Sequence, residues 1–231
     1  MFFAVRISSL DRRRVLISAS AMNPRPASTN GSHRRVTCAL TVLLAFALHG
    51  PASAHVESGT AAGLVSGLSH PITGLDHLVA MVAVGLWGAQ LGSPAIWLLP
   101  ITFPLVMALG GLLGLAGLGL PLTEQAVALS AVVLGALVLL RAQPPLWIAA
   151  LIVAYFAIFH GYAHGRELPH AADPLAYGLG FVIATGLLHL CGILIGTLTR
   201  WPLGESVVRA CGAAVGCVGC YFLLASFGLM S

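Results

Sequence analysis

Beyond residue 54 the chain consists of long apolar runs separated by short groups of glycine, proline and polar residues. Each run has roughly 17–25 residues, the length that an α-helix needs to cross a hydrocarbon core about 30 Å thick. The runs are continuous and do not alternate between apolar and polar residues, which favours helices over strands. The pattern predicts an all-α polytopic membrane protein, a six-transmembrane-helix bundle. The predicted spans cover residues 71–91, 95–118, 123–142, 145–163, 174–198 and 205–229.

Groups of breaker residues mark the ends of the predicted helices. Gly92-Ser93-Pro94 follows the first span, and Gln143-Pro144-Pro145 follows the third. Glycine and proline at such positions favour turns. The connections are too short for a separate soluble domain. We therefore expect two parts, a signal peptide with an extended n-region at 1–54 and a six-helix membrane domain at 55–231.

The end of the first part has the layout of a secretory signal peptide. Arg34 and Arg35 precede the apolar run Val36–Leu48, and Ala52-Ser53-Ala54 follows it. A charged region, an apolar region and small residues at a cleavage position are typical of such signals. Cleavage after Ala54 makes His55 the first residue, and its amine and imidazole could together chelate a metal ion.

The sequence leaves alternatives open at the start of the chain. Residues 1–33 are an extended n-region, or translation begins at Met22. The alternative to a cleaved signal is that the apolar run at 36–48 is an uncleaved anchor helix. Its 13 apolar residues are few for a membrane span, which favours cleavage.

Composition supports a membrane location. Hydrophobic residues make up 58% of the chain and charged residues 8%, and the mean hydropathy is +0.95. A soluble domain cannot bury that much apolar surface. All 11 basic residues are arginine, and seven of them precede residue 36. The remainder is near-neutral, so the formal charge of +4 does not indicate binding to nucleic acid.

The arginines also predict how the protein is oriented in the bilayer. With a cleaved signal, His55 lies outside, and the loops that contain Arg141 and Arg200 lie inside. The outer loops contain only Arg166, which is next to Glu167. This distribution agrees with the positive-inside rule. We expect a multi-pass protein of the bacterial inner membrane with both mature termini in the periplasm.

The first cluster of ionisable residues is His70-Pro71-Ile72-Thr73-Gly74-Leu75-Asp76-His77, which leads into the uncharged run Leu78–Leu91. Ionisable side chains are costly in a membrane and by default indicate function. On one continuous helix, His70, Gly74 and His77 share a face at i, i+4 and i+7. Gly74 would then leave a gap between the two rings.

The second cluster, Phe159-His160-Gly161-Tyr162-Ala163-His164-Gly165-Arg166-Glu167, lies at the end of the fourth predicted span. His160 and His164 are four residues apart, and Glu167 follows three residues later, so all three share a helix face. Imidazoles at this spacing suit a divalent metal ion. The alternative is a pair of solvated interfacial histidines.

The expected topology brings the two clusters to the same side of the membrane. The first span runs inward and carries His70 and His77 in its outer half. The fourth span runs outward and ends near His160 and His164. The sequence therefore predicts one outward-facing site with four imidazoles and Asp76.

His189 lies deeper, in the fifth predicted span. It is either a second metal position or a hydrogen-bond donor between helices.

Several other features favour packing. Three Gly-x-x-x-Gly pairs, at 110–114, 192–196 and 212–216, predict close helix contacts in lipid. Cys217 and Cys220 form a C-x-x-C that we interpret as part of a small-residue packing stripe. Glu205 and Arg209 form either a surface ion pair, or Arg209 holds a helix end against the bundle.

Both clusters resemble motifs of the HupE/UreJ family, membrane accessory proteins of hydrogenase and urease that are nickel/cobalt permeases. Members carry H-P-x-x-G-x-D-H in the first span and F-H-G-x-A-H-G in the fourth, which match residues 70–77 and 159–165. The resemblance covers nearly all of the chain beyond the signal. It implies uptake of Ni²⁺ or Co²⁺ by a secondary or facilitated route, for delivery to metal-accepting accessory proteins of hydrogenase or urease maturation.

The resemblance also implies roles for individual residues. It makes His70, Asp76, His77, His160 and His164 metal-interacting residues. Glu167 fits the acidic residue that follows the family's second motif. Members often begin with a histidine-rich segment, which is reduced here to His55-Val56-Glu57.

The chemistry leaves alternatives open. Imidazole suits Ni²⁺ and Co²⁺ without excluding Zn²⁺ or Cu²⁺. We expect a non-enzyme without a resident cofactor, since the intramembrane protease motif H-E-x-x-H is not met where Gly161 follows His160. The rivals are a membrane haem or metal protein, as electron carrier or metalloenzyme, with His77 and His189 as axial ligands, and a metal sensor or chaperone.

Overall fold

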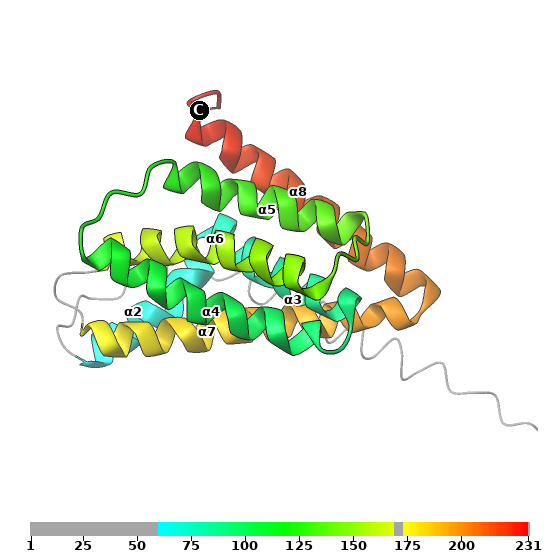
Figure 1. Cartoon of the computed structure of the whole chain (residues 1–231), viewed down its shortest axis with the longest axis horizontal. Coiled ribbons are helices and arrows are strands. Elements are labelled where there is room, and N and C mark those ends of the chain that lie inside the picture. Colours follow the sequence, from blue (N-terminus) through cyan, green and yellow to red (C-terminus); the bar gives the residue numbers. More distant parts are fainter. Residues whose placement is uncertain (1–59, 169–172, 231) are drawn as a thin grey trace, which may run out of the picture. The chain divides into compact units, whose positions relative to one another are not determined.

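The computed structural model describes residues 60–168 and 173–230, and within them seven α-helices and one short 3-10 helix follow one another without a strand (Figure 1). They are α2 (Thr60–Thr73), α3 (Leu75–Leu91), α4 (Ala95–Leu115), α5 (Thr123–Leu139), α6 (Leu146–Arg166), α7 (Pro174–Gly196), η1 (Thr197–Arg200) and α8 (Pro202–Ser226). The predicted all-α class is confirmed. The predicted signal peptide, its cleavage position and His55 lie outside the described residues.

Four of these elements are long and apolar enough to cross a membrane, namely α4, α6, α7 continued by η1, and α8. The helices α2 and α3 pass this test as a pair, which is bent by 81°. With that pair counted as one span, the described residues contain up to five candidate spans. The helix α5 is apolar but shorter, with 17 residues. The total of six spans stays a prediction.

The first predicted span is wrong as a single straight helix, because the chain turns at Gly74. This residue precedes α3 with extended backbone angles, φ −85° and ψ 105°. The Thr73 hydroxyl donates to the carbonyl of His70 at 3.0 Å, a local bond that competes with helix continuation at the end of α2. His70 and His77 therefore lie on different helices and do not share one face.

The other helix ends agree with the predicted breakers to within a few residues. The helix α3 ends before Gly92, whose φ of 77° lies in the region that favours glycine. The helix α4 ends at Leu115, earlier than predicted, and α6 continues to Arg166, later than predicted. The whole second histidine motif up to Arg166 therefore lies on α6, and Glu167 follows directly.

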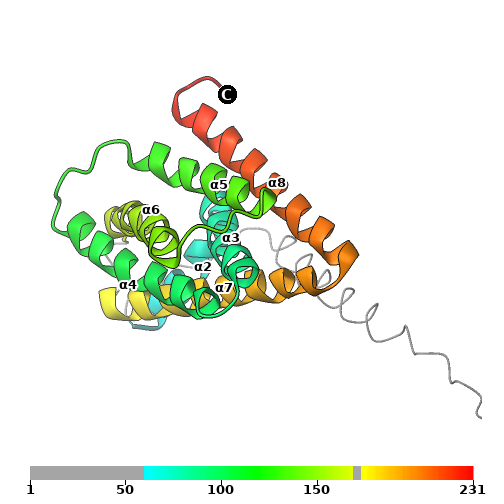
Figure 2. The same ribbon diagram turned by 45° about the vertical axis from the view of Figure 1, so that its right-hand side comes forward.

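Helices pack in close pairs at glycines, as the Gly-x-x-x-Gly pattern predicts. Between α4 and α6, a Cβ atom on Gly161 would run into the main-chain carbonyl of Met107, and one on Gly110 into that of Ile158. Similar contacts join α2 to α7, α3 to α7 and α5 to α8 (Figure 2). Gly216 is an exception, since a Cβ there would meet open space. Small residues give close contact where lipid supplies no hydrophobic drive between helices.

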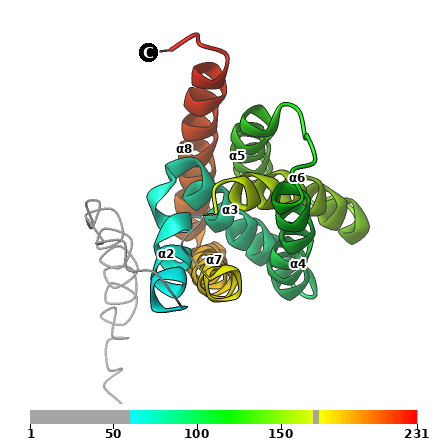
Figure 3. The same cartoon turned by 90° about the vertical axis from the view of Figure 1, so that its left-hand side faces the viewer.

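The helix α3 is the innermost element. Every residue from Ala80 to Gly88 is buried, and α3 packs against α4, α5 and α7 (Figure 3). This packing holds the first turn of α3, with Asp76 and His77, against the neighbouring helices.

The end of α5 shows which role Arg209 has. Its Nε atom donates to the carbonyl of Leu139 at 3.0 Å, which satisfies one of the carbonyls that a helix leaves unpaired at its C-terminus. Glu205 accepts instead from Arg141, at 2.8 Å. The predicted Glu205–Arg209 ion pair is therefore wrong, and the alternative, Arg209 holding a helix end, is confirmed.

The interpretation of the C-x-x-C as a packing stripe is also wrong. Cys217 and Cys220 are exposed on α8. The buried face of α8 consists instead of Gly204, Val208, Gly212, Val215 and Gly219. The packing stripe is thus offset from the two cysteines by about one residue along the helix.

Candidate metal-binding site

The two histidine motifs meet where the end of α2, the start of α3 and the end of α6 come together. The ring of His164 lies 4.9 Å from that of His70 and 4.4 Å from that of His77, between ring centres. The rings of His77 and His160 are 5.0 Å apart. The structure therefore brings together the four imidazoles that the sequence selected, although they come from three helices rather than two.

The exposed side of the site holds His70 and Glu167. His70 Nε2 donates to Glu167 Oε2 at 3.0 Å, and His164 Nδ1 lies 3.9 Å from the same oxygen. The ligand atoms of these three residues all lie within 4.8 Å of one another. Nitrogen and oxygen ligands about 2.1 Å from one ion are about 3–4 Å apart, so small side-chain movements are enough for a shared cation.

Glu167 is suited to attract a cation. Its side chain is 55% exposed, against 31% for His70. The hydrogen bond from His70 holds the pKa of the Glu167 carboxyl below its ordinary value, although partial burial acts in the opposite direction. The carboxylate therefore stays ionised at neutral pH, at the solvent-facing side of the cluster.

Asp76 is hydrogen-bonded to the next residue of the motif, His77. Its Oδ1 atom accepts a hydrogen bond from His77 Nδ1 at 2.9 Å and another from the His77 main-chain N–H at 2.9 Å. The proton on Nδ1 leaves the lone pair on His77 Nε2. A carboxylate that orients a histidine in this way is common behind metal ligands and makes the ring a better donor. The structure thus shows Asp76 orienting the ring of His77.

The buried side of the site holds His160 and His164, with 0% and 5% of their surface exposed. His160 Nδ1 donates to the carbonyl of Phe156 at 3.0 Å, one turn earlier on α6, so the lone pair is on Nε2. His160 Nε2, His77 Nε2 and both ring nitrogens of His164 are buried without a hydrogen-bond partner among the described residues. Unpaired buried polar atoms are rare and call for an explanation, which a cation ligand supplies.

Two aromatic residues of α7 complete the walls of the histidine cluster. The sequence analysis did not identify them as site residues. The ring of Phe181 lies 4.2 Å from that of His164, and the ring of Tyr177 lies 6.0 Å from that of His70. They are four residues apart, at the start of the fifth predicted span and on its outer side. That spacing was the available signal, but aromatic residues at helical spacing more often indicate ordinary packing.

The predicted gap at Gly74 is not where a ligand could fit. A Cβ atom on Gly74 would lie 3.3 Å from Asp76 Oδ1 and 3.3 Å from His77 Nδ1, so this glycine packs close to the Asp76–His77 pair. The space between the rings of His70 and His77 contains the ring of His164, which contacts both.

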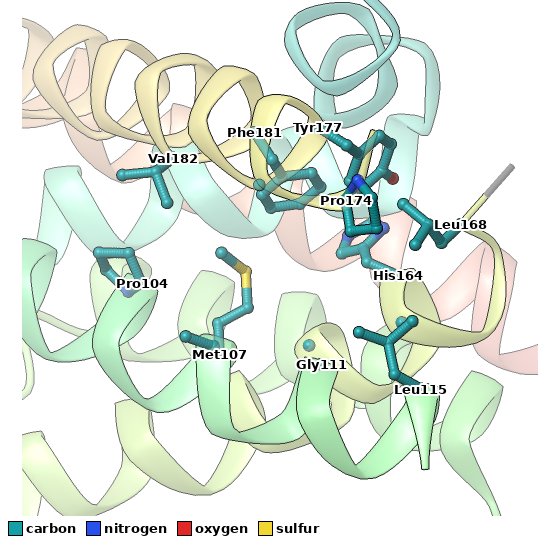
Figure 4. A pocket seen from close by; sticks show the side chains of 14 residues that line it. Pro104, Met107, Gly111, Leu115, His164, Leu168, Pro174, Tyr177, Phe181 and Val182 are labelled. Carbon is teal, nitrogen blue, oxygen red and sulfur yellow. The ribbon is translucent and has the colours of Figure 1, made fainter. Parts of the chain in front are cut away.

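A cavity of about 120 Å³ lies beside the site between α4, α6 and α7 (Figure 4). His164 lines one part of it, and Met107, Leu168 and Phe181 are among its other, apolar walls. Its walls offer a hydrated cation few polar partners. The cavity therefore leaves room for movement of His164 rather than forming the ligand set.

His189 is separated from this cluster. Its Nδ1 donates to the carbonyl of Met81 at 2.7 Å, which confirms the predicted hydrogen bond between helices. The ring of Phe103 contacts the rings of both His160 and His189. The loop residue His170, like His55, lies outside the described residues.

Known proteins give a consistent classification. Residues 42–222 match the family model described as HupE / UreJ protein. The chain is 44% identical over 185 residues to Protein HupE of Rhizobium leguminosarum bv. viciae, which covers 80% of this chain and 96% of that protein. No solved structure matches the chain. Since the family model spans most of the chain, including both histidine motifs, this protein belongs to the HupE/UreJ family.

Proposed function

We propose that this protein takes up Ni²⁺, and Co²⁺ as a chemically similar ion, across the bacterial inner membrane by a secondary or facilitated route. The imported metal then supplies hydrogenase or urease maturation through metal-accepting accessory proteins. The observation that carries the proposal is the cluster of four imidazoles with Glu167 and Asp76. Several buried ring nitrogens in this cluster have no hydrogen-bond partner in the described part of the chain. Family membership agrees, because these proteins are accessory and transport proteins rather than known enzymes.

The ligand chemistry supports a borderline divalent ion. Imidazole nitrogen suits Ni²⁺ and Co²⁺, whereas Mg²⁺ and Ca²⁺ prefer sites made of oxygen ligands only. His77 and His160 each direct one proton to an oxygen acceptor and keep the other nitrogen free. They are thus ready to bind a metal without a change of tautomer.

The gradient of exposure supports transport rather than permanent storage. Glu167 is exposed, His70 is partly buried, His164 is buried, and His160 is fully buried. A cation first meets a carboxylate at the surface and then exchanges oxygen and water for ring nitrogens. Transport requires that each step binds the ion weakly enough for release.

The proposal includes the predicted membrane topology. A cleaved signal peptide would put the mature N-terminus in the periplasm, and six spans would return the C-terminus to the same side. The bent pair α2–α3 is then the first span, and α5, with 17 residues, is a short third span. A length of 17 residues lies at the lower end of the range for transmembrane helices. The histidine cluster then faces the periplasm.

Uptake of radioactive nickel into proteoliposomes tests the function. Full-length protein is reconstituted, and nickel accumulation is compared with that in empty liposomes. The measurement is repeated with an excess of Co²⁺, Zn²⁺ or Mg²⁺ as competitor. We expect saturable uptake that Co²⁺ inhibits and Mg²⁺ does not. Absence of uptake above empty liposomes would contradict the proposal, and a haem Soret band in the purified protein would favour the electron-carrier alternative instead.

A further inference from the structure

The outer cluster and His189 belong to one continuous column of rings. Beyond His77 and His160, the next contact is with Phe103, whose ring centre lies 5.3 Å from that of His160. Phe103 in turn lies 5.5 Å from His189. The column thus contains five imidazoles, with one phenyl ring between the fourth and the fifth.

We propose that His189 is a second, inner binding position for the transported cation, separated from the outer cluster by the ring of Phe103. The inference rests on the proposed nickel transport and extends it, since it assigns the residue that receives the ion after the outer site.

The surroundings of His189 match those of a metal ligand. The side chain is 1% exposed, and Nδ1 donates to the carbonyl of Met81 on α3. The lone pair is therefore on Nε2, which is buried without a hydrogen-bond partner among the described residues. A main-chain carbonyl behind one ring nitrogen is a usual way to orient a metal-ligating histidine. The hydrogen bond between helices explains Nδ1, but it does not explain the free Nε2.

A second unpartnered donor lies one turn earlier on α7. Thr185 is fully buried, and its hydroxyl oxygen has no hydrogen-bond partner among the described residues. Residues four apart on a helix share a face, so Thr185 and His189 are on the same side of α7. Together they offer one nitrogen and one oxygen ligand.

Phe103 explains why these are two positions rather than one. Its side chain, from α4, is fully buried and contacts the rings of both His160 and His189. The ring offers no lone pair for coordination, although the face of an aromatic ring attracts cations. An ion that leaves His160 must therefore pass this ring before it reaches a nitrogen again.

The order of the two positions follows from α3. His189 bonds to Met81, four residues further along α3 than His77. At 1.5 Å per residue, this places the bond about 6 Å further from the end of the bundle that holds His70 and Glu167. Further along, Gln90 donates to Val138 at the other end of α3. His189 is thus the deeper position.

A substitution that keeps the hydrogen bond but removes the lone pair tests the inference. In His189→Asn, the side-chain amide can donate to Met81 in place of Nδ1, while no group replaces Nε2. The full-length variant is compared with the wild type by nickel uptake into proteoliposomes and by Ni²⁺ binding in equilibrium dialysis. Ser130→Ala is the control, because Ser130 is an equally buried polar residue on α5 whose hydroxyl bonds within its own helix.

We expect His189→Asn to lower uptake at least about tenfold, while Ni²⁺ affinity at the outer site stays within about twofold of the wild type. Ser130→Ala should keep both properties. Uptake within twofold of the wild type in His189→Asn overturns the inner position and leaves the hydrogen bond as the role of this ring. A wild type that neither binds nor imports Ni²⁺ contradicts the proposed function itself.

A second variant keeps the inference testable if His189→Asn does not insert into the membrane. His189→Leu, which has a side chain of similar size without any ligand atom, is measured in the same way and should show the same loss of uptake. If neither variant inserts although Ser130→Ala does, His189 is a structural residue and the inference is overturned.

Discussion

Asp76 Oδ1 accepts a hydrogen bond from His77 Nδ1 at 2.9 Å, and this bond decides which nitrogen of the ring is free. The same oxygen accepts the main-chain N–H of His77 at 2.9 Å, so the carboxylate is fixed at the first turn of α3. This bond leaves the lone pair of His77 on Nε2, and we propose that Asp76 acts on a cation through this ring. The order of the two residues in the motif does not distinguish these roles.

Substitutions of Asp76 test whether this carboxylate acts on a cation through His77. Asp76→Asn keeps an oxygen that can accept the proton of Nδ1, so we expect Ni²⁺ affinity to fall by about tenfold. Asp76→Ala removes the acceptor and should abolish uptake, with a loss of affinity of about 100-fold. Isothermal titration of the purified variants measures both values. Equal losses in Asn and Ala variants would indicate that the carboxylate itself is a ligand.

Substitution of single histidines should distinguish those that bind the metal ion from those that do not. His77→Ala and His164→Ala each remove a ring whose free nitrogens face the cluster, and we expect both to abolish nickel accumulation in cells. Both variants should insert into the membrane at wild-type levels, as immunoblots of membrane fractions would show. His170→Ala is the matched control, because the sequence puts this histidine in a loop, and it should be nearly silent. Unchanged uptake in His77→Ala and His164→Ala would reject the site.

The close contact between α4 and α6 should be sensitive to one methyl group. A Cβ atom on Gly161 would meet the carbonyl of Met107, so Gly161→Ala must push α6, with His160 and His164, away from α4. We expect a loss of stability of about 1–3 kcal/mol and a marked loss of uptake. Gly186→Ala on α7 is the control, because nothing lies within 4 Å of a Cβ there. Thermal unfolding in detergent compares the two, and equal melting temperatures would contradict the close contact.

Nickel binding should weaken in acid because protons compete for imidazole nitrogen. Each ring nitrogen binds either a proton or the metal ion, so Ni²⁺ affinity should decline from pH 7.5 to pH 5.5 and further below it. The hydrogen bond with His70 lowers the pKa of Glu167. This carboxylate therefore stays ionised between pH 7.5 and pH 5.5 and loses its negative charge only at lower pH. Glu167→Gln should therefore weaken binding at every pH without removing the decline. Binding curves measured from pH 7.5 down to about pH 4 test the sign, and an affinity that does not change over this whole range would speak against imidazole ligands.

The sequence predicted the site better than the helix that contains its first half. The shared face of His160 and His164 and the glycine contacts follow from spacing, because side chains three and four residues apart share a helix face. The convergence of the two motifs was expected from the predicted topology. The turn at Gly74 did not follow, since the apolar run continues across it and a hydropathy pattern contains no information on backbone angles. Phe103 and Phe181 were missed for a related reason. An aromatic residue in an apolar span looks the same whether it packs against lipid, a helix or a histidine ring.

The role of Arg209 shows the same limit at the other end of α5. Sequence spacing allowed a bond with Glu205 on its own helix, whereas the structure uses Arg209 for a carbonyl of α5 and pairs Glu205 with Arg141. A helix end with unpaired carbonyls competes for the guanidinium, and only the packing of α5 against α8 makes that carbonyl available.

The 81° corner between α2 and α3 would have a consequence for the selectivity of the proposed uptake. His70 belongs to one arm of this corner and His77 to the other, so the distance between their nitrogens depends on a main-chain angle. In a straight rod that distance would be constant. An ion that ligated both rings would therefore have to match this angle with its radius and preferred bond directions. An ion of the wrong size would contact the histidine of only one of the two helices.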